Sequence, residues 1–127
     1  MVDQASRQIL CAAVGKGREH DFKLFKRSAV RLAPTIECLG DRGYQGLQKR
    51  HAKSRTPIKK PRGREVSKAD KHRNRILASH RIVCEHVIGK LKVFKILAER
   101  YRNRCRRFGL RVHLLAALYN LDLLCPR

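Results

Sequence analysis

The strongest hydrophobic pattern in this chain lies in its C-terminal half. Apolar residues such as Val87 and Leu91 recur every three or four positions across residues 78–101, which predicts one long helix. The opposite face of that helix is also partly apolar and carries the acid Glu85. A helix that is apolar on two sides packs between other elements, so we expect Glu85 to be partly buried. An unpaired buried carboxylate is costly, and a metal ion or a basic side chain would offset that cost.

Shorter patterns predict elements before and after this helix. Residues 7–14 form an apolar run that ends at a glycine turn, so we expect a buried strand there, preceded by a hairpin turn over residues 3–6. Residues 35–40 predict a second short strand, with Asp41 at its C-terminal end. The last helix, over residues 110–124, is apolar almost all round, and we expect it to pack against the sheet.

Polar and turn residues mark local boundaries. Asp21 is expected to cap a short helix over residues 22–28. Gly43 and Gly46 are expected to allow a tight turn around Tyr44. The whole pattern is α/β, with short strands and a helix-rich C-terminal half.

Residues 49–75 differ from their surroundings and are typical of an exposed basic loop. Prolines, a glycine and many Lys and Arg residues interrupt any apolar period. A short helix is expected from Lys68 onward, with Ser67 as its cap. The dense positive charge favours a surface that follows a phosphate backbone, and a solvated linker is the alternative. A second arginine-rich stretch covers residues 100–107.

Composition narrows the class of protein. The 127 residues suffice for one small domain, which we expect to span residues 1–127, and 43% of them are hydrophobic, which excludes a disordered tail. Lys and Arg number 31 against 10 Asp and Glu, a net charge of +21. Such a surplus repels itself and favours a polyanionic partner, for which nucleic acid is the default. No apolar run reaches the length of a membrane span, and no signal peptide is recognised, so we expect a cytoplasmic protein with no membrane partner.

The five cysteines are an odd number and include no C-x-x-C pair. Zinc sites use closely paired ligands, and Cys84 and His86, although close in sequence, point to different faces of a helix. We therefore expect buried free thiols in a reducing compartment rather than a zinc site.

Three motifs follow one another along the chain. They are GREHDFKLFKRS over residues 17–28, GDRGYQGL over residues 40–47 and RIVCEHVIGKLKVFKILAERYR over residues 81–102. Together they resemble the catalytic domain of DDE transposases of bacterial insertion sequences, particularly the group related to insertion sequence five. The resemblance covers nearly the whole chain, and its last two motifs are the specific ones. It implies a truncated ribonuclease H-like fold, in which a mixed sheet is flanked by helices.

The resemblance also implies a metal site. In that family three acids, Asp, Asp and Glu, hold two divalent ions, Mg²⁺ or Mn²⁺. The second Asp matches Asp41, and the Glu matches Glu85. Hard oxygen ligands suit two-metal cleavage of a phosphodiester, so both residues are the expected catalytic and metal-binding residues. On residue chemistry alone, Asp41 serves equally as a turn former before Gly43, and Glu85 equally as an ion-pair partner of Arg81 or Lys92.

The implied partner is DNA, both the ends of the insertion sequence and the target. The residues expected to contact its backbone are basic and lie after the second strand, in the basic loop, on the long helix and in the arginine-rich stretch. They are Arg42, Lys59, Lys60, Arg62, Arg81, Lys90, Lys92, Arg102, Arg104, Arg106 and Arg107. The expected setting is the nucleoid of a bacterial cytoplasm.

The first catalytic Asp of that family has no match here. Asp3 is an early acid, but it lies in the wrong place, before the second or third strand of the fold. Either a decayed or truncated gene, or an upstream reading frame joined by frameshifting, would account for the missing Asp. The expected protein partner is a second copy of the chain in a homodimer or a complementing N-terminal transposase fragment. We expect the chain alone not to cut DNA efficiently. Mn²⁺-dependent cleavage that Glu85→Gln abolishes would contradict this.

Two other interpretations stay open. One is a small basic module that coats DNA or RNA without catalysis, although only 6% of the residues are aromatic and no stacking platform is visible. The other is a non-functional remnant with charge-driven affinity for DNA. Geometry discriminates between these classes, because only a transposase core would bring the carboxylates of Asp41 and Glu85 within reach of a shared metal ion.

The basic composition generates a prediction about salt. With about six to ten phosphate contacts, the affinity for DNA should fall by roughly 10³–10⁵ between 50 and 200 mM salt, because each contact releases condensed counterions. Fluorescence anisotropy of a labelled duplex across this range measures the slope. A flat response to salt would contradict an electrostatic footprint.

Overall fold

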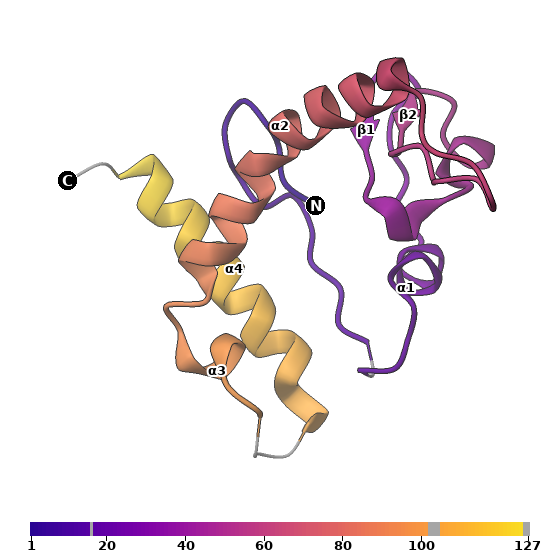
Figure 1. The fold of residues 1–127 in the computed structure, drawn as a ribbon. Coiled ribbons are helices and arrows are strands. Elements are labelled where there is room, and N and C mark those ends of the chain that lie inside the picture. The colour runs from indigo at the N-terminus through magenta and orange to yellow at the C-terminus, as the bar shows by residue number, and fades with distance from the viewer. Residues whose placement is uncertain (16, 102–104, 126–127) are drawn as a thin grey trace. The chain divides into compact units, whose positions relative to one another are not determined.

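The computed structural model describes residues 1–15, 17–101 and 105–125, which form helices and one small parallel sheet (Figure 1). These residues divide into two compact units, the strand unit Gly15–Arg81 and the helical unit, which combines Met1–Val14 with Ile82–Arg127. The single domain expected from the sequence stays a prediction. In chain order the elements are α1 (Asp21–Arg27), β1 (Cys38–Leu39), the 3-10 turns η1 (Arg42–Tyr44) and η2 (Leu47–Lys49), β2 (Ser54–Arg55), α2 (Lys68–Leu91), α3 (Lys95–Ala98), the 3-10 turn η3 (Cys105–Arg107) and α4 (Phe108–Leu124).

The strand unit is organised around a very short parallel pairing. In it Cys38 lies opposite Ser54, and Leu39 lies opposite Arg55. One further ladder bond runs from the Gly40 N–H to the Arg55 carbonyl at 2.8 Å. β1 falls inside the strand expected over residues 35–40, whereas β2 lies within the expected basic loop and was not predicted.

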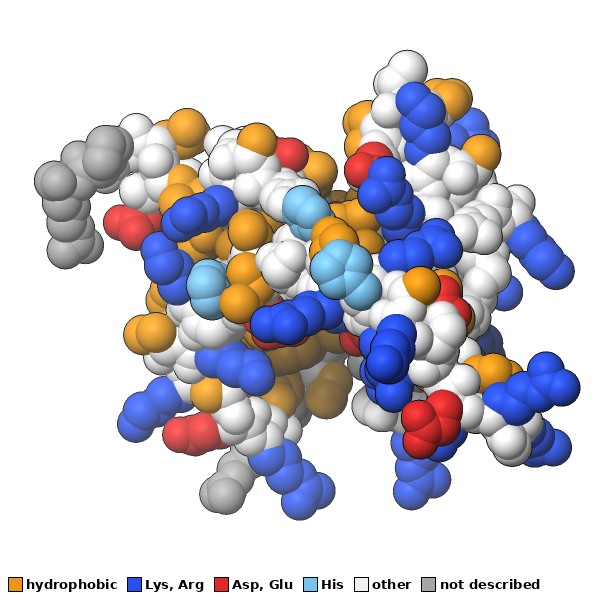
Figure 2. Space-filling model, turned by 45° about the horizontal axis from the view of Figure 1, so that its top comes forward, with side chains coloured by type: hydrophobic (Ala, Val, Ile, Leu, Met, Phe, Trp, Pro, Cys, Tyr) orange, Lys and Arg blue, Asp and Glu red, His pale blue; other side chains and the backbone are white. Residues whose placement is uncertain are grey.

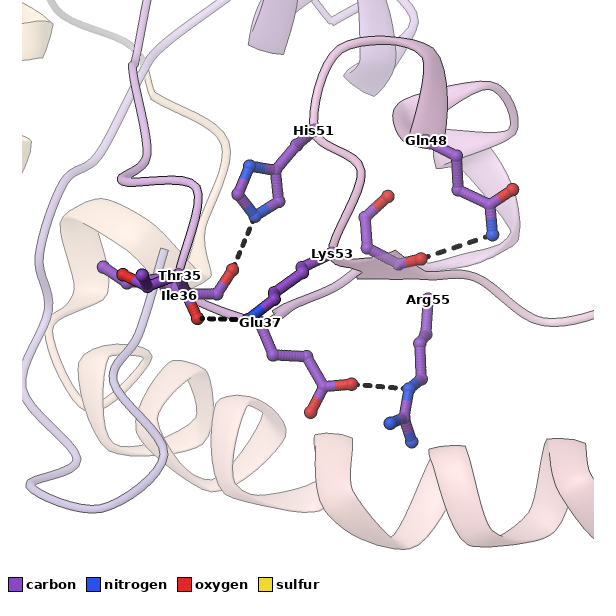
Figure 3. Close-up of polar contacts among 8 residues, drawn as sticks. Thr35, Ile36, Glu37, Gln48, His51, Lys53 and Arg55 are labelled. Carbon is purple, nitrogen blue, oxygen red and sulfur yellow. Dashed lines mark hydrogen bonds and ion pairs between the residues drawn. The ribbon is translucent and has the colours of Figure 1, made fainter.

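Side chains reinforce this ladder (Figure 3). The Glu37 carboxylate pairs with Arg55 Nε at 2.5 Å, which ties the residue before β1 to β2. The ring nitrogen Nε2 of His51 lies 2.6 Å from the Ile36 carbonyl oxygen. Because His51 is buried, this hydrogen bond is sheltered from water and more costly to lose. The segment before β1 is therefore held to the segment around β2 by more than two ladder residues.

Aromatic rings and two buried leucines, Leu47 and Leu77, make the core of the strand unit. Phe22 and Phe25 of α1 contact Tyr44 of η1 edge-on, with ring centroids 6.2 and 6.0 Å apart. Leu47 is only 1% exposed. The tight turn expected around Tyr44 is confirmed, and Gly46 adopts the left-handed conformation that this turn requires, with φ of 89°.

Helix α1 begins one residue earlier than the sequence predicts. Its cap is His20, whose ring Nδ1 accepts the Phe22 N–H at 3.3 Å. Asp21, the expected cap, lies instead in the first turn, where its negative charge still complements the helix dipole.

Helix α2 is shifted toward the N-terminus relative to the prediction, since it spans 68–91 and not 78–101. Ser67 caps it as predicted, because its Oγ accepts the Asp70 N–H at 3.1 Å. The helix start at Lys68 agrees with the short helix predicted there, but its unbroken continuation to Leu91 was not predicted, because the first turns carry polar residues without an apolar period. After Leu91 a turn leads to the short helix α3.

The expectation that α2 is buried on two sides is wrong. Val87 is 1% exposed and marks the buried face, whereas Ile82 and Ile88 are 49% and 45% exposed. Glu85 is also exposed, so no burial cost demands a partner for its carboxylate. Single apolar side chains are common on protein surfaces, so their periodicity alone does not establish burial.

The N-terminal segment belongs to the helical unit. Val2 and Ile9 form one antiparallel bridge, and the Asp3 carboxylate accepts the Ser6 N–H at 2.7 Å, which confirms the expected hairpin turn. The Ser6 hydroxyl also donates to this carboxylate. Together the hydroxyl and the N–H of Ser6 hold the pKa of the Asp3 carboxyl below its ordinary value. The buried strand expected over residues 7–14 is not formed beyond Ile9.

Helix α4 confirms the last predicted helix and supports the N-terminal segment. The Asn120 amide accepts the Ile9 N–H at 2.8 Å and donates to the Ile9 carbonyl at 3.0 Å. One side chain thus supplies both hydrogen bonds that a neighbouring strand would offer. His113 adds a contact of 2.9 Å to the Ala12 carbonyl.

Only one face of α4 is buried, through Ala116 and Tyr119. The other face exposes the five leucines 110, 114, 118, 121 and 124. The expected packing of this helix against the sheet stays a prediction. Despite its leucines, no helix in the described residues is long and apolar enough to cross a membrane.

All five cysteines are free thiols, as expected. Their expected burial is wrong for Cys105 and Cys125, which are exposed, while the other three are half-buried. Burial raises the pKa of the Cys38 thiol on strand β1.

Close packing around Gly40 generates a prediction. A Cβ at this position would lie 3.0 Å from Thr56 and 3.1–3.2 Å from Tyr44 and Leu47, so Gly40→Ala should lower the free energy of unfolding by about 1–3 kcal/mol. Gly89→Ala on α2 is the matched control, because its Cβ would meet nothing within 4 Å. That change should raise stability by about 0.5–1 kcal/mol through helix propensity. Urea denaturation measures both, and equal effects would contradict the prediction.

Candidate functional site

Asp41 follows directly after the β1–β2 ladder, at the C-terminal end of β1, as the sequence predicts. Its Oδ1 accepts the Arg42 N–H at 2.5 Å, and Asp41 is the cap of η1. The turn-forming role of this residue is therefore confirmed. A turn former at a strand end still presents a carboxylate to solvent, so this role leaves a second one open.

The other oxygen of Asp41 is held by an arginine. Asp41 Oδ2 lies 3.2 Å from Nη2 of Arg81, which is on helix α2. The Asp41 side chain is 55% exposed and that of Arg81 24% exposed, so the pair is accessible to water. At such exposure an ion pair contributes about 0–1 kcal/mol to stability. Both oxygens of Asp41 thus have a donor from the protein itself.

Glu85 lies one helical turn after Arg81 on α2, on the same helix face, and belongs to the helical unit. In the part of the chain that the structure describes, Glu85 forms no ion pair, so the pairing with Arg81 or Lys92 considered from the sequence is not made. The convergence of Asp41 and Glu85 on a shared ion stays a prediction.

A pocket of about 680 Å³ lies next to Arg42 in the strand unit, and we call it the basic pocket. Its walls are the segment 58–60 and the first part of α2. Five of its eight lining residues are cationic and none is acidic, so it favours an anion. The lining residues are Arg42, Ile58, Lys59, Lys60, Val66, Lys71, Asn74 and Arg75.

One side chain positions a wall of the basic pocket. The Asn74 amide on α2 accepts the Ile58 N–H at 2.9 Å and donates to the Ile58 carbonyl at 3.1 Å. The preceding carbonyl, that of Pro57, accepts from the Gln45 amide at 2.9 Å. These bonds hold the backbone just before Lys59, so the cation that follows projects from an ordered segment and not from a free loop.

Similarity to known proteins shows the family of this chain. Residues 1–120 match the family model described as DDE superfamily endonuclease. The chain belongs to this DDE endonuclease family. It is also 50% identical over 123 residues to a protein of Microchaete diplosiphon named "Probable transposase for insertion sequence element IS702". That match covers 97% of this chain and 45% of the relative, so the chain spans less than half the length of the relative. No solved structure matches the chain.

DDE endonucleases generally use divalent metal ions, and Asp41 offers the oxygen ligands such ions prefer. In the described residues Asp41 supplies only part of the donor set that such an ion needs, and its oxygens already face donors from the protein. One oxygen of Asp41 accepts the Arg42 N–H, and the other faces the Arg81 guanidinium. Within the described residues, no three His, Cys, Asp or Glu side chains gather as a metal site would require.

The basic residues expected to bind DNA fall into different places in this chain. Arg42, Lys59 and Lys60 line the basic pocket, whereas Arg81 pairs with Asp41. The others in the described part are exposed elsewhere on the surface, and Figure 2 shows how widely Lys and Arg side chains spread over the face drawn. These are Arg62, Lys90, Lys92, Arg106 and Arg107; Arg102 and Arg104 lie outside the described residues.

Five of the eight pocket residues were not among the predicted site residues, and three of these five are polar. Lys71, Asn74 and Arg75 line the pocket together because they are three and four residues apart on α2. The signal was present as a K-x-x-N-R spacing after the Ser67 cap. These residues lie in the short helix expected from Lys68, but their place beside segment 58–60 depends on a contact between residues distant in sequence.

The amide clamp at Asn74 leads to a testable prediction. Asn74→Ala removes two hydrogen bonds to Ile58, each contributing about 1 kcal/mol, so hydrogen exchange at residues 58–60 should accelerate. Asn120→Ala is the matched control, because it removes the equivalent pair from Ile9 in the helical unit. Exchange measured by mass spectrometry should change at 58–60 in the first variant only. Unchanged exchange there would show that Asn74 does not order the pocket wall.

Proposed function

We propose that this chain is part of a DDE transposase that binds DNA and takes part in cutting and joining at the ends of an insertion sequence. The family match and the IS702 relative support this function. Because the chain spans less than half of that relative, the proposed reaction belongs to a longer protein or to an assembly of which this chain is one part.

The observation that carries the proposal is the position of the basic pocket. Arg42 lines the pocket and is the residue directly after Asp41. A backbone phosphate bound there would lie next to the carboxylate that the family resemblance assigns to catalysis. Five cations without an acid among the lining residues match the charge of a phosphodiester.

The proposed fold of the complete core is ribonuclease H-like. The parallel β1–β2 pair with an acid at its C-terminal end and the helix-rich C-terminal half are compatible with that architecture. The family match covers both features. The strands observed are shorter than such a sheet requires, and further strands would have to come from outside this chain.

Asp41 and Glu85 are the proposed catalytic and metal-binding residues, and Mg²⁺ or Mn²⁺ the proposed ions. Carboxylates are suitable ligands for both ions, which would supply phosphodiester chemistry when bound. Glu85 supports the proposal through its exposure, because a ligand must be reachable, and through its place one turn after Arg81 on α2. No described basic side chain competes for it in an ion pair.

DNA contacts are proposed beyond the pocket as well. The exposed cations of α2, the turn after it and η3 would follow the phosphate backbone. The exposed leucines of α4 form an apolar surface that a homodimer mate or a complementing N-terminal transposase fragment would cover. The proposed setting is the nucleoid of a bacterial cytoplasm.

A nucleic-acid-binding module without catalysis is the second candidate, favoured by the net charge of +21 and by the same pocket. Both functions require DNA affinity. Metal binding that depends on Asp41 separates them, because a pure binding module has no use for a metal ligand at that place.

The pocket gives a prediction about phosphate contacts. Lys71→Gln with Arg75→Gln should reduce the magnitude of the slope of log affinity against log salt by about 2, because each lost contact removes about 0.9. The matched control is Lys23→Gln with Arg31→Gln, which removes the same charge from exposed positions of the strand unit outside the pocket. Its slope should stay close to that of the wild-type chain. Equal slopes for both double variants in fluorescence anisotropy would refute a specific role for the pocket.

A further inference from the structure

The contact between Arg81 and Asp41 joins two residues for which the sequence predicts other partners. Asp41 is the proposed ligand of a divalent ion, and Arg81 was expected to contact DNA phosphates. In the structure the Arg81 guanidinium lies 3.2 Å from Asp41 Oδ2 instead. A positive charge therefore already stands where the proposed ion would approach the carboxylate.

We propose that Arg81 is an internal counter-cation of Asp41, which holds the carboxylate in the metal-free chain and must leave before a divalent ion binds there. This inference rests on the proposed function, since it takes Asp41 to be a metal ligand. It assigns to Arg81 the role of a positioning residue that acts through Asp41.

Charge is the reason that the two cations compete. Asp41 has two oxygens: Oδ1 accepts the Arg42 N–H at 2.5 Å, and Oδ2 faces the Arg81 guanidinium at 3.2 Å. An ion that binds Oδ2 would sit within a few ångströms of the guanidinium, where like charges repel strongly. The ion binds the carboxylate only after the Asp41–Arg81 ion pair has broken. The free energy of that ion pair therefore lowers the apparent affinity of Asp41 for the metal ion.

Exposure makes the exchange feasible. The Asp41 side chain is 55% exposed, so an ion reaches it from solvent without opening the core. The pair is weak at this exposure and does not lock the carboxylate permanently. Arg81, at 24% exposure, is anchored by the backbone of α2, so its side chain can change rotamer while the helix stays in place.

Arg81 has an obvious second partner once it is released. The planar guanidinium binds phosphate oxygens with two parallel hydrogen bonds, as it does a carboxylate. Arg42, the neighbour of Asp41, lines the basic pocket, so a DNA strand bound there would bring phosphates to the same region of the strand unit. Metal binding at Asp41 and phosphate binding by Arg81 would then favour each other, since each removes the ion pair that opposes the other.

Mn²⁺ binding to the 127-residue chain without DNA tests the inference. Electron paramagnetic resonance of free Mn²⁺ gives the dissociation constant for the wild type and each variant. Arg81→Gln should tighten binding by up to about fivefold, the factor that corresponds to an exposed ion pair, while Arg81→Lys, which keeps the charge, should stay near the wild type. Arg42→Gln is the matched control, because it removes a charge next to Asp41 but keeps the backbone N–H that Asp41 accepts. It should tighten binding less than about threefold.

Asp41→Asn separates the inference from the proposed function. It should weaken Mn²⁺ binding and cancel the effect of Arg81→Gln in the double variant. If Asp41→Asn has no effect in either background, Asp41 is not a metal ligand and the proposed function fails. If Asp41→Asn weakens binding but Arg81→Gln does not tighten it, the counter-cation role of Arg81 is refuted while the metal assignment stands.

A measurement on the wild type keeps the test independent of how the variants fold. In a Mg²⁺ titration followed by NMR, the Arg81 Nε–H signal should shift together with the Asp41 backbone amide. An Asp41 amide that responds while Arg81 does not would overturn the proposal. Circular dichroism of each variant identifies any that are unfolded.

Discussion

The strand unit depends on the parallel pairing of Cys38–Leu39 with Ser54–Arg55. Two residues per strand are too few to be stable alone, and the structure supplements them with Glu37–Arg55 and the buried contact of His51 with the Ile36 carbonyl. This pairing also sets the positions of the residues that directly follow β1. It ends at Gly40, so Asp41 emerges at the strand end, and Arg42 enters the wall of the basic pocket.

Positive charge is the second constraint, because 31 cations face only 10 acids. Four acids in the described residues pair with a cation: Glu19 with Arg27, Glu37 with Arg55, Glu65 with Lys71, and Asp41 with Arg81. Most cations are left without a carboxylate, which suits a protein whose partner brings its own negative charge. Asp41 would have two roles under the proposed function, because the proposed metal ligand also serves as the counter-ion of Arg81.

Two asparagines show how a chain with so little sheet orders its extended segments. Asn74 and Asn120 each lie on a helix, and each uses its side-chain amide to satisfy both backbone groups of one residue, Ile58 and Ile9. An amide side chain carries the same donor and acceptor as a peptide group, so it can replace a neighbouring strand for one residue. At Ile58 this device has a functional consequence, because the next two residues are the lysines of the basic pocket.

The sequence alone determined the features that depend on near neighbours and on motif wording. The Ser67 cap, the hairpin turn at Asp3, the final helix and the acid after the first paired strand are local, and the motif order pointed to the family that the comparison confirmed. Only the tertiary structure decided which distant residues meet. Strand β2 has no apolar period from which it could be predicted. The Asp41–Arg81 pair joins residues 40 positions apart, and the exposure of Glu85 depends on which elements cover α2. Periodicity records which face of an element is apolar, but the path of the chain decides which face is covered and which charges come together.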